Sequence, residues 1–355
     1  MNQKKTKILI VDDSAIIRKL LRTIFEKEPT FEVIGAAPDP YIARDMIARE
    51  TPDVMTLDIE MPKMDGIAFL EKIMAHHPIR TVIISSLSKA GSEIAMRAFE
   101  VGAVDVIEKP SIDVNTVMMD NGRTIIEKVK QVAKANVSQI QPKRTYRSIA
   151  KTNISSGALE KTTHQILAVA SSTGGTETLK EIFTKLPADI PGTVIVQHMP
   201  PGFTKTYAES LNKICPFNVK EAEENDTILP GHVYLAPGNF HMRIKRVGGF
   251  YKIRLSQEPH IHGVRPAADL LMESVAKEVG ANAIGLIVTG MGKDGAQGLL
   301  KMKEAGSFNI AQDEKTCVVY GMPREAFEVG AIHTVASLGN IPNELIKQFK
   351  ARAVS

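Results

Sequence analysis

The stretch ILAVASSTGG, residues 166–175, decides the fold of the second half of this chain. Its first five residues are apolar and predict a buried strand, whereas the hydroxyl- and glycine-rich residues that follow predict a tight turn. A helix-type pattern of apolar residues begins directly after Gly175. A strand that passes through a tight turn into a helix is the repeating unit of α/β proteins with parallel sheets.

The same alternation of short apolar runs and helical stretches continues outward from this unit. In the second half, strands are predicted at residues 166–170, 193–197, 232–235, 283–289 and 307–311. In the first half, strands are predicted at residues 8–11, 31–36, 54–57, 81–84 and 104–107. We therefore predict two domains of the α/β class. The first is a flavodoxin-like domain with a five-stranded parallel sheet, and the second is a doubly wound, Rossmann-like α/β domain.

The composition favours two folded domains in the cytoplasm. The chain has 355 residues, of which 43% are hydrophobic, enough for two cores and too many for disorder over most of the chain. Its two cysteines, Cys215 and Cys317, exclude a disulfide scaffold and a C-x-x-C zinc motif. The first residues, MNQKKTKILIVDDS, are too rarely apolar for a signal peptide or a spanning helix. We expect a cytoplasmic monomer without membrane insertion.

A basic, polar segment separates the two halves. Between residues 124 and 165, eight Lys or Arg outnumber two Glu, a local net charge of +6 in a chain of net charge +4. Residues 139–163 are rich in Ser and Thr and include Pro142 and Gly157, which is typical of a linker. Since Tyr146 alone offers a stacking ring there, we expect a solvated tether and no nucleic-acid partner. We predict domains at residues 1–125 and 162–355, joined by a helix extension and flexible linker at residues 126–161.

A hydroxyl nucleophile is the first candidate for chemistry in the second half. Ser172 lies on the predicted strand-to-helix turn, where the first amides of a helix can stabilise a developing oxyanion. The hydrolase motif G-x-S-x-G is half matched, because Ala170 stands at its first glycine. His198 and Asp294 each follow another apolar run and could serve as base and orienting group. A Ser-His-Asp triad is one interpretation; a phosphate-binding turn or a plain helix cap is another.

A dinucleotide site is the rival interpretation of the same half. The pattern Gly290-x-Gly292-x-x-Gly295 follows a predicted strand and opens a helix, and Asp313 ends the next strand about 20 residues further on. These are the parts of a nucleotide-dependent oxidoreductase. That interpretation leaves Ser172 and His198 without a role, whereas the triad also uses the loop between these glycines.

Polar residues also follow four strands of the first half. They are Asp12 and Asp13, Asp58, Ser85 and Ser86, and Lys109. The carboxyl ends of parallel strands meet at one edge of a sheet, so three carboxylates there repel one another unless a cation neutralises them. Oxygen ligands without His or Cys suit Mg²⁺, which keeps waters for a phosphate. A lysine and a hydroxyl at the same edge would contact phosphoryl oxygens.

The motifs ILIVDDS, TLDIEMPKMDG, VIISSL and GAVDVIEKP resemble the receiver domains of two-component response regulators over about residues 5–125. The resemblance implies that Asp58 accepts a phosphoryl group from a histidine kinase. The other implied site residues are Asp13, Asp58 and the backbone carbonyl of Glu60 around Mg²⁺, and Asp12, Ser85 and Lys109 around the phosphoryl group. Many receivers carry an aromatic switch residue where this chain has Val106, which argues against a switch of that kind here.

The motifs SSTGGTETL, VIVQHMPPGFT, VYLAPGNFHM, IVTGMGKDGAQGL and AQDEKTCVVYGMPREAF resemble the catalytic domain of the chemotaxis protein-glutamate methylesterase (CheB) family over about residues 162–350. The resemblance implies Ser172 as nucleophile, His198 as general base and acid, Asp294 as the group that fixes the imidazole tautomer, and amides near Thr173 and Met291 as the oxyanion hole. The implied reaction, which needs no metal, turns γ-glutamyl methyl esters on chemoreceptors into glutamate and methanol, and some members also deamidate glutamines.

Two questions stay open at this point. A phosphorylation-controlled binding module without catalysis and a nucleotide-dependent oxidoreductase remain the alternative functions. His241 and Arg265 lie in family-like segments, and they could line a substrate cleft or serve the structure alone. The family resemblance also implies that the receiver restrains the esterase until Asp58 is phosphorylated.

Overall fold

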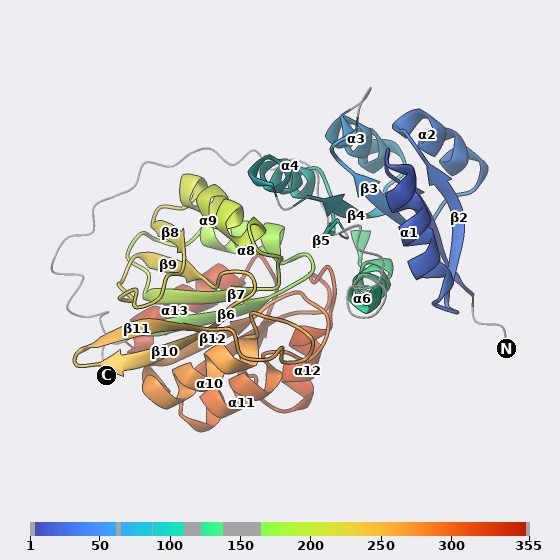
Figure 1. Ribbon diagram of the computed structural model, residues 1–355. Coiled ribbons are helices and arrows are strands. Elements are labelled where there is room, and N and C mark those ends of the chain that lie inside the picture. Colours follow the sequence, from blue (N-terminus) through green and yellow to red (C-terminus); the bar gives the residue numbers. More distant parts are fainter. Residues whose placement is uncertain (1–3, 62–64, 87, 110–121, 138–164, 353–355) are drawn as a thin grey trace. The chain divides into compact units, whose positions relative to one another are not determined.

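The computed structural model describes residues 4–61, 65–86, 88–109, 122–137 and 165–352 (Figure 1). The chain divides into two compact units, residues 1–144 and residues 145–355. Residues 138–161 of the predicted linker lie outside the described residues. The predicted domain limits, at residues 125 and 162, therefore stay predictions.

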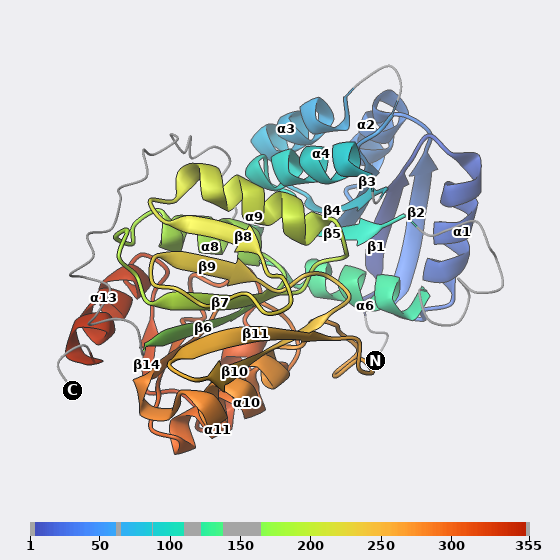
Figure 2. The same ribbon diagram turned by 60° about the vertical axis from the view of Figure 1, so that its left-hand side comes forward.

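The first unit is built on a five-stranded sheet with strand order β2-β1-β3-β4-β5, in which every neighbouring pair is parallel. Its elements are β1 (Thr6–Val11), α1 (Ala15–Glu26), β2 (Phe31–Ala37), α2 (Pro40–Arg49), β3 (Val54–Asp58), α3 (Gly66–His76), β4 (Arg80–Ser85), α4 (Lys89–Glu100), β5 (Asp105–Glu108) and α6 (Gly122–Ala133). Helices α1 and α6 cover one face of the sheet, and α2, α3 and α4 cover the other (Figure 2). The predicted five-stranded parallel sheet is confirmed.

Short polar side chains begin four helices of this unit. The N-cap residues of α1, α2, α3 and α4 are Ser14, Asp39, Asp65 and Ser88, and each accepts a hydrogen bond from an amide of the first helical turn. Such caps satisfy amides that have no partner inside the helix. The cap of α1 also contacts the carboxyl edge of the sheet, because the amide of Ser14 donates to Oδ1 of Asp12 at 2.8 Å.

The second unit is built on a seven-stranded parallel sheet with strand order β14-β13-β12-β6-β7-β9-β8. Its strands in this sheet are β6 (Ile166–Ser171), β7 (Gly192–Gln197), β8 (Asn218–Glu221), β9 (His232–Leu235), β12 (Ala283–Ile287), β13 (Phe308–Gln312) and β14 (Thr334–Ala336). Its helices are α8 (Gly175–Phe183), α9 (Phe203–Ile214), α10 (Ala268–Glu278), the short 3₁₀ helix η3 (Gly280–Asn282), α11 (Ala296–Glu304), α12 (Met322–Glu328) and α13 (Ile341–Arg352). Helices α8, α9 and α13 cover one face, and α10, α11 and α12 cover the other (Figures 1 and 2).

A separate antiparallel hairpin, β10 (His241–Val247) and β11 (Phe250–Ser256), belongs to the same unit. Met242, Ile244 and Ile253 pack one of its faces into the core of the unit. Two side chains of α10, Ser274 and Glu278, accept hydrogen bonds from amides of β10. The outer edge of β10 is therefore capped by side chains rather than left open for another strand.

Both main sheets reverse their strand order next to their first strand. In the second unit, β6 pairs with β7 on one side and with β12 on the other. In the first unit, β1 pairs with β2 on one side and with β3 on the other. Such switch points open a crevice at the carboxyl ends of the two diverging strands, where α/β proteins bind ligands. Each main sheet thus has one switch point of this kind.

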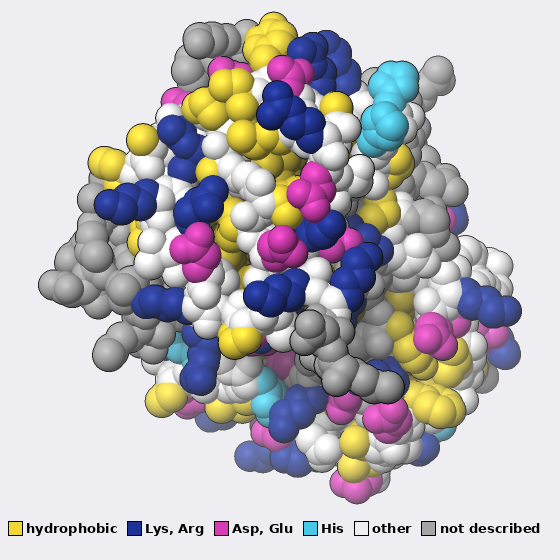
Figure 3. Space-filling model, turned by 90° about the vertical axis from the view of Figure 1, so that its right-hand side faces the viewer, with side chains coloured by type: hydrophobic (Ala, Val, Ile, Leu, Met, Phe, Trp, Pro, Cys, Tyr) yellow, Lys and Arg dark blue, Asp and Glu magenta, His cyan; other side chains and the backbone are white. Residues whose placement is uncertain are grey.

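The surface in Figure 3 mixes basic, acidic and apolar side chains without an extended field of one sign. Exposed apolar side chains of the first unit include Ile16, Tyr41 and Ile42, which are 58%, 49% and 40% exposed. On the face drawn there, charges that alternate in this way give little long-range steering of a charged ligand.

Candidate functional site

Ser172 lies on a turn between β6 and α8 that the buried Gln197 holds from β7. The side-chain amide of Gln197 donates to the carbonyl of Ser172 at 2.9 Å and accepts from the Ser171 hydroxyl at 2.5 Å. Gly174 has a φ of +78°, and a Cβ there would lie 2.5 Å from Val318. Glycine is therefore required at this position, both for the backbone angle and for the space. Ser172 itself is 8% exposed, and no hydrogen bond from its hydroxyl is found among the described residues.

His198 follows β7 and comes next to the serine turn. The register pairs Ser171 with Gln197, and the amide of His198 donates to the carbonyl of Ser171 at 3.2 Å. Its ring Nε2 lies 2.8 Å from Oδ2 of Asp294. Because an ionised carboxylate only accepts, Nε2 carries the proton and Nδ1 is left as the acceptor for a hydroxyl. The structure thus joins His198 to Asp294 and places Ser172 at the adjoining strand end, without a closed Ser172–His198 hydrogen bond.

Asp294 is held by the N-terminus of α10. Its Oδ2 accepts from the amide of Ala268 at 2.6 Å, and its Oδ1 accepts from the amide of Asp269 at 3.0 Å. The N-cap residue of α10 is Ala267, which has no capping side chain. Asp294 therefore supplies that cap from a different loop.

The pKa of Asp294 is lowered although the carboxyl is only 3% exposed. Burial by itself raises this pKa, but the hydrogen bond and charge of His198 and the amides of Ala268 and Asp269 outweigh it. The positive end of the α10 dipole acts in the same direction. Asp294 is thus ionised at neutral pH and can stabilise a protonated imidazole.

A buried polar network ties the serine turn to the loops after β12 and β13. The amide of Ser172 donates to the carbonyl of Thr289 at 3.1 Å. The Thr289 hydroxyl donates to the carbonyl of Thr173 at 3.0 Å and accepts from the amide of Val319 at 2.9 Å. Gln312 accepts from the amide of Thr289 at 2.8 Å. Sequence reasoning missed Gln197, Thr289 and Gln312; the available signal was a polar residue at the end of an otherwise apolar run.

Gly290 brings the loop after β12 directly against the nucleophile turn. A Cβ at this position would lie 2.8 Å from Cβ of Ser172 and 2.3 Å from Sδ of Met322. The carboxylate of Asp313 accepts from the amide of Thr316 within its own turn. The space that a pyrophosphate would need beside Gly290 is filled, and Asp313 is engaged locally, so the dinucleotide interpretation is not favoured.

The predicted oxyanion-hole residues, Thr173 and Met291, adjoin the same turn. Thr173 follows Ser172 directly, and Met291 follows Gly290, which packs on Ser172. The amide of Ser172 is already bonded to Thr289 and so does not point to an oxyanion. The amides of Thr173 and Met291 remain the predicted donors.

His241 and Arg265 each make several hydrogen bonds within the second unit. His241 is fully buried; its Nε2 donates to the carbonyl of Pro259 at 3.0 Å, and its Nδ1 accepts from the amide of Ala267 at 3.1 Å. Burial lowers the pKa of its imidazole, which agrees with a neutral ring. The guanidinium of Arg265 donates to the Asn239 side chain and to two backbone carbonyls. These contacts anchor both residues to the loop that precedes α10.

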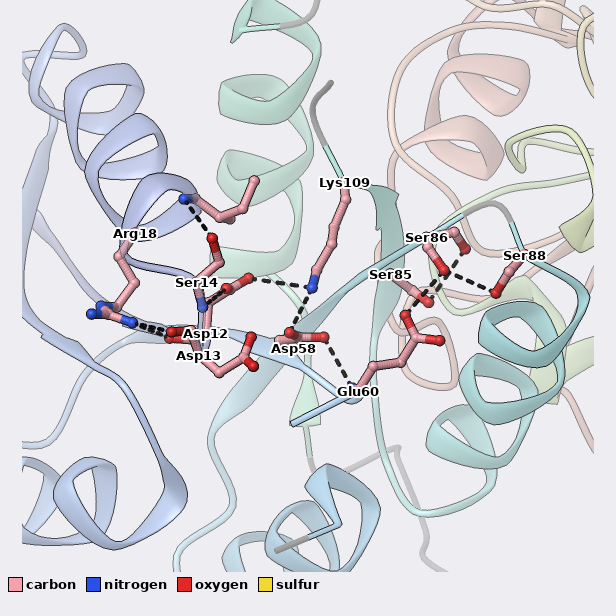
Figure 4. Close-up of polar contacts among 11 residues, drawn as sticks. Asp12, Asp13, Ser14, Arg18, Asp58, Glu60, Ser85, Ser86, Ser88 and Lys109 are labelled. Carbon is pink, nitrogen blue, oxygen red and sulfur yellow. Dashed lines mark hydrogen bonds and ion pairs between the residues drawn. The ribbon is translucent and has the colours of Figure 1, made fainter. Parts of the chain in front are cut away.

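The second candidate site lies at the switch point of the first unit. Lys109 Nζ lies 2.6 Å from Oδ2 of Asp58 and 3.8 Å from Oδ2 of Asp12 (Figure 4). Asp12, Asp13 and Asp58 offer carboxylate oxygens that all lie within 4.8 Å of one another. The sequence-predicted acidic residues and Lys109 are therefore brought together.

The electrostatics of this cluster fit a divalent cation. Burial and the charge of Asp58 raise the pKa of Asp12 to about 6, and its Oδ2 has no hydrogen-bond partner among the described residues. Burial also raises the pKa of Asp58, with Lys109 opposing the change. A hard cation such as Mg²⁺ would neutralise three crowded carboxylates and coordinate the Asp12 Oδ2 that lacks a hydrogen bond.

The remaining predicted residues of this site border the cluster. The amide of Glu60 donates to Oδ1 of Asp58 at 3.0 Å, and the Glu60 carboxylate accepts from the Ser86 hydroxyl (Figure 4). Ser85 ends β4 and is fully buried. Val106 is fully buried in β5, beside Ile83 of β4. The predicted role of the Glu60 carbonyl as a metal ligand stays a prediction.

A receiver-like unit with clustered carboxylates, followed by a parallel α/β unit with a serine turn and a His-Asp pair, defines a response regulator with a hydrolase-type effector domain. Two family models match the chain: the response regulator receiver domain over residues 8–120 and the CheB methylesterase over residues 167–345. The chain belongs to the CheB methylesterase family.

Relatives support this over the whole chain. A protein-glutamate methylesterase/protein-glutamine glutaminase of Bdellovibrio bacteriovorus is 57% identical over 349 residues, 98% of this chain and 99% of its own. One of the same name from Thiobacillus denitrificans is 46% identical over 350 residues, 98% of each chain. The CheB methylesterase catalytic domain of Thermotoga maritima is 42% identical with a TM-score of 0.51, covering 52% of this chain and 97% of that one. Among the described helices, none has the length and apolar character to span a membrane.

Proposed function

We propose that this chain is a phosphorylation-regulated protein-glutamate methylesterase that also deamidates protein glutamines. The observation that carries the proposal is the His198–Asp294 hydrogen bond beside the Ser172 turn, in a chain that is 57% identical over its length to a relative of that name. The substrates are methyl-accepting chemoreceptors, and the reaction takes place in the cytoplasm. The site needs no cofactor for the ester hydrolysis.

The first half-reaction forms an acyl-enzyme. Nδ1 of His198 takes the hydroxyl proton of Ser172 while Oγ bonds to the carbonyl carbon of the γ-glutamyl methyl ester. The amides of Thr173 and Met291 stabilise the oxyanion of the tetrahedral intermediate. The imidazolium then gives its proton to the departing methoxide, so methanol leaves and a γ-glutamyl ester of Ser172 remains.

The second half-reaction releases the product. His198 takes a proton from water, the hydroxide attacks the acyl carbon, and the proton returns to Oγ of Ser172 as the glutamate leaves. With a glutamine substrate the first leaving group is ammonia instead of methanol. Throughout, Asp294 keeps the proton on Nε2 of His198 and offsets the charge of the imidazolium.

The first unit supplies the regulation. Asp58 accepts a phosphoryl group from a histidine kinase, and Lys109 and the hydroxyl of Ser85 contact its oxygens. Asp13, Asp58 and the carbonyl of Glu60 would hold Mg²⁺, with Asp12 beside them. When bound, Mg²⁺ neutralises charge that develops on the transferring phosphoryl group. The receiver restrains the esterase until this transfer occurs.

Methanol release from methylated chemoreceptor membranes tests the proposal. We expect the wild type to release methanol, and a small-molecule phosphodonor with Mg²⁺ to increase the rate. The variant Ser172→Ala should lose at least about 10³-fold in rate while it still takes up phosphate, which separates the two chemistries. Full activity of Ser172→Ala would disprove the triad. No release by folded, phosphorylated wild type, together with phosphorylation-dependent capture of the membranes, would favour a binding module.

A further inference from the structure

A second His-Asp pair lies next to the proposed triad. Asp269 is 5% exposed, and its Oδ2 lies 2.9 Å from Nε2 of His262. Its Oδ1 accepts from the amide of Gly298 in α11 at 2.7 Å. Carboxylate oxygens of Asp269 and Asp294 lie within 4.8 Å of each other and of His262. Two buried carboxylates this close repel each other, so a role that offsets this cost is expected for Asp269.

The backbone of the same residue holds the triad aspartate. The amide of Asp269 donates to Oδ1 of Asp294, and the preceding amide, of Ala268, donates to Oδ2. Oδ2 is also the oxygen that binds Nε2 of His198. The direction of the His198–Asp294 bond therefore depends on where the first turn of α10 lies.

Besides Asp294 and the packing of α10 on the core, three side-chain contacts hold that turn. The side chain of Asp269 ties it to α11 through Gly298 and to the preceding loop through His262. The third contact is His241, whose Nδ1 accepts the amide of Ala267. Since Ala267 cannot cap the helix, the turn has no capping side chain of its own. The Asp269 carboxylate is thus the contact that links the turn to the helix following Asp294.

We propose that Asp269 is a positioning residue of the hydrolytic site and acts through the first turn of α10. Its carboxylate anchors the turn to Gly298 and His262, so that the amides of Ala268 and Asp269 hold Asp294 in line with His198. The proposal rests on the proposed function only for its kinetic test. A displacement of about 1 Å in a catalytic group can cost on the order of 100-fold in rate.

The experiment compares Asp269→Ala, Asp269→Asn and His262→Ala in the full chain, with a blocked glutamate γ-methyl ester as the small substrate. Asp226→Ala is the matched control, because Asp226 also anchors a turn, through the amide of Glu223, and lies in the loop before β9. Three quantities are measured: kcat and KM, the pH dependence of kcat/KM, and the downfield proton NMR signal of the His198 N–H bonded to Asp294. Because the His262 N–H is also bonded to a carboxylate, the signal that persists in His262→Ala is the one assigned to His198.

We expect Asp269→Ala to lower kcat by about 10- to 100-fold with KM within twofold, and to shift the acidic limb of kcat/KM to lower pH. Asp269→Asn keeps an acceptor for Gly298 and should recover part of the loss, while His262→Ala should lose less than Asp269→Ala. The His198 signal should broaden or move in Asp269→Ala and stay unchanged in Asp226→Ala.

A folded Asp269→Ala with wild-type kcat, pH profile and imidazole signal would overturn the positioning role. Equal losses in Asp269→Ala and Asp226→Ala would do the same, since they would show general destabilisation. The NMR signal does not depend on turnover. If wild type hydrolyses no ester, the proposed function fails, and the signal alone still decides whether Asp269 positions Asp294.

Discussion

Asp12 is a buried carboxyl that the folded receiver holds under electrostatic stress. Burial and the neighbouring Asp58 raise its pKa to about 6, and its Oδ2 has no hydrogen-bond partner among the described residues. Between the ordinary value of 3.8 and 6, the folded state binds more protons than the unfolded state. Stability therefore falls as pH rises through this range. The repulsion between the ionised carboxylates is greatest at neutral pH, where the site would bind a cation.

We predict that Asp12→Asn stabilises the receiver without divalent cations. Since one pKa unit corresponds to about 1.4 kcal/mol, the gain above pH 6 should be on the order of 2–3 kcal/mol, and it should vanish near pH 4. Hydrogen exchange of peptides covering β1 and β3, with a chelator present, measures it. Saturating Mg²⁺ should shrink the gain, because the cation relieves the same repulsion in the wild type.

Asp45→Asn is the control for this measurement, since Asp45 is exposed and pairs only with Arg44 among the described residues. Such a surface change should alter stability by no more than about 0.5 kcal/mol. A gain in Asp12→Asn that persists unchanged at pH 4 would show that repulsion is not its source.

Inspection of the residues that follow each predicted strand identified the side chains that could react. It did not identify the side chains that hold the reactive residues in place. Ser172, His198 and Asp294 could be selected from the sequence because each follows an apolar run and carries reactive chemistry. Gln197, Thr289 and Gln312 occupy similar places, yet amide and hydroxyl side chains there are equally compatible with ordinary strand ends. Their roles depend on partners more than 20 residues away, such as Thr173 for Thr289. The spacing of residues along the sequence does not show which of these distant residues come into contact.

At the scale of elements, strands with a continuous apolar run could be predicted, whereas strands with mixed burial could not. All ten predicted strands are present, whereas β8, β14 and the hairpin β10–β11 were missed. β8 has four residues and β14 has three, and both are partly exposed. Their pairing depends on the neighbouring strand rather than on their own apolar pattern. The hairpin alternates buried and charged residues, a pattern that a search for continuous apolar runs overlooks.

In the loop after β12, a side chain at residue 290 would not fit. A methyl group on Gly290 would overlap Met322 and press on Ser172. We predict that Gly290→Ala lowers kcat for a small ester by about 10- to 100-fold, because the serine turn must shift. The flexible Met322 can yield, so the unit should still fold. Steady-state kinetics together with a thermal melt measure both effects.

Gly249→Ala serves as the matched control, because a Cβ there meets no atom within 4 Å. It should leave both kcat and the melting temperature unchanged. If Gly290→Ala retained wild-type kcat, the close approach of this loop to Ser172 would have no bearing on catalysis.

At the scale of the whole molecule, the same feature of a parallel sheet, its switch point, serves two different reactions. Each unit gathers its reactive side chains at the carboxyl ends of strands around the point where strand order reverses, between β1 and β3 in one and between β6 and β12 in the other. The chemistry differs because one switch point has carboxylates and a lysine near it, whereas the other has a hydroxyl, an imidazole and a single carboxylate. Regulation therefore has to pass from one complete site to another.

We predict that Asp58→Asn abolishes activation by a phosphodonor and keeps basal esterase activity within about twofold. The variant lacks the phosphoryl acceptor but has an intact hydrolytic site. Methanol release from methylated receptor membranes, with and without phosphodonor and Mg²⁺, measures both quantities. Asp53→Asn, which removes a carboxylate that binds the amide of Lys7, should respond like wild type. Activation that survives in Asp58→Asn would place the phosphoacceptor elsewhere.

The capping of α10 by Asp294 also bears on when the enzyme becomes active during its synthesis. Asp294 and the amide of Ala268 are 26 residues apart, and Thr289 is not held until Gln312 and Val319 have been made. Domains fold as units, the N-terminal one first. During synthesis, the receiver is therefore complete long before the hydrolytic site can assemble. Each newly made esterase domain thus already has its regulatory receiver attached and folded.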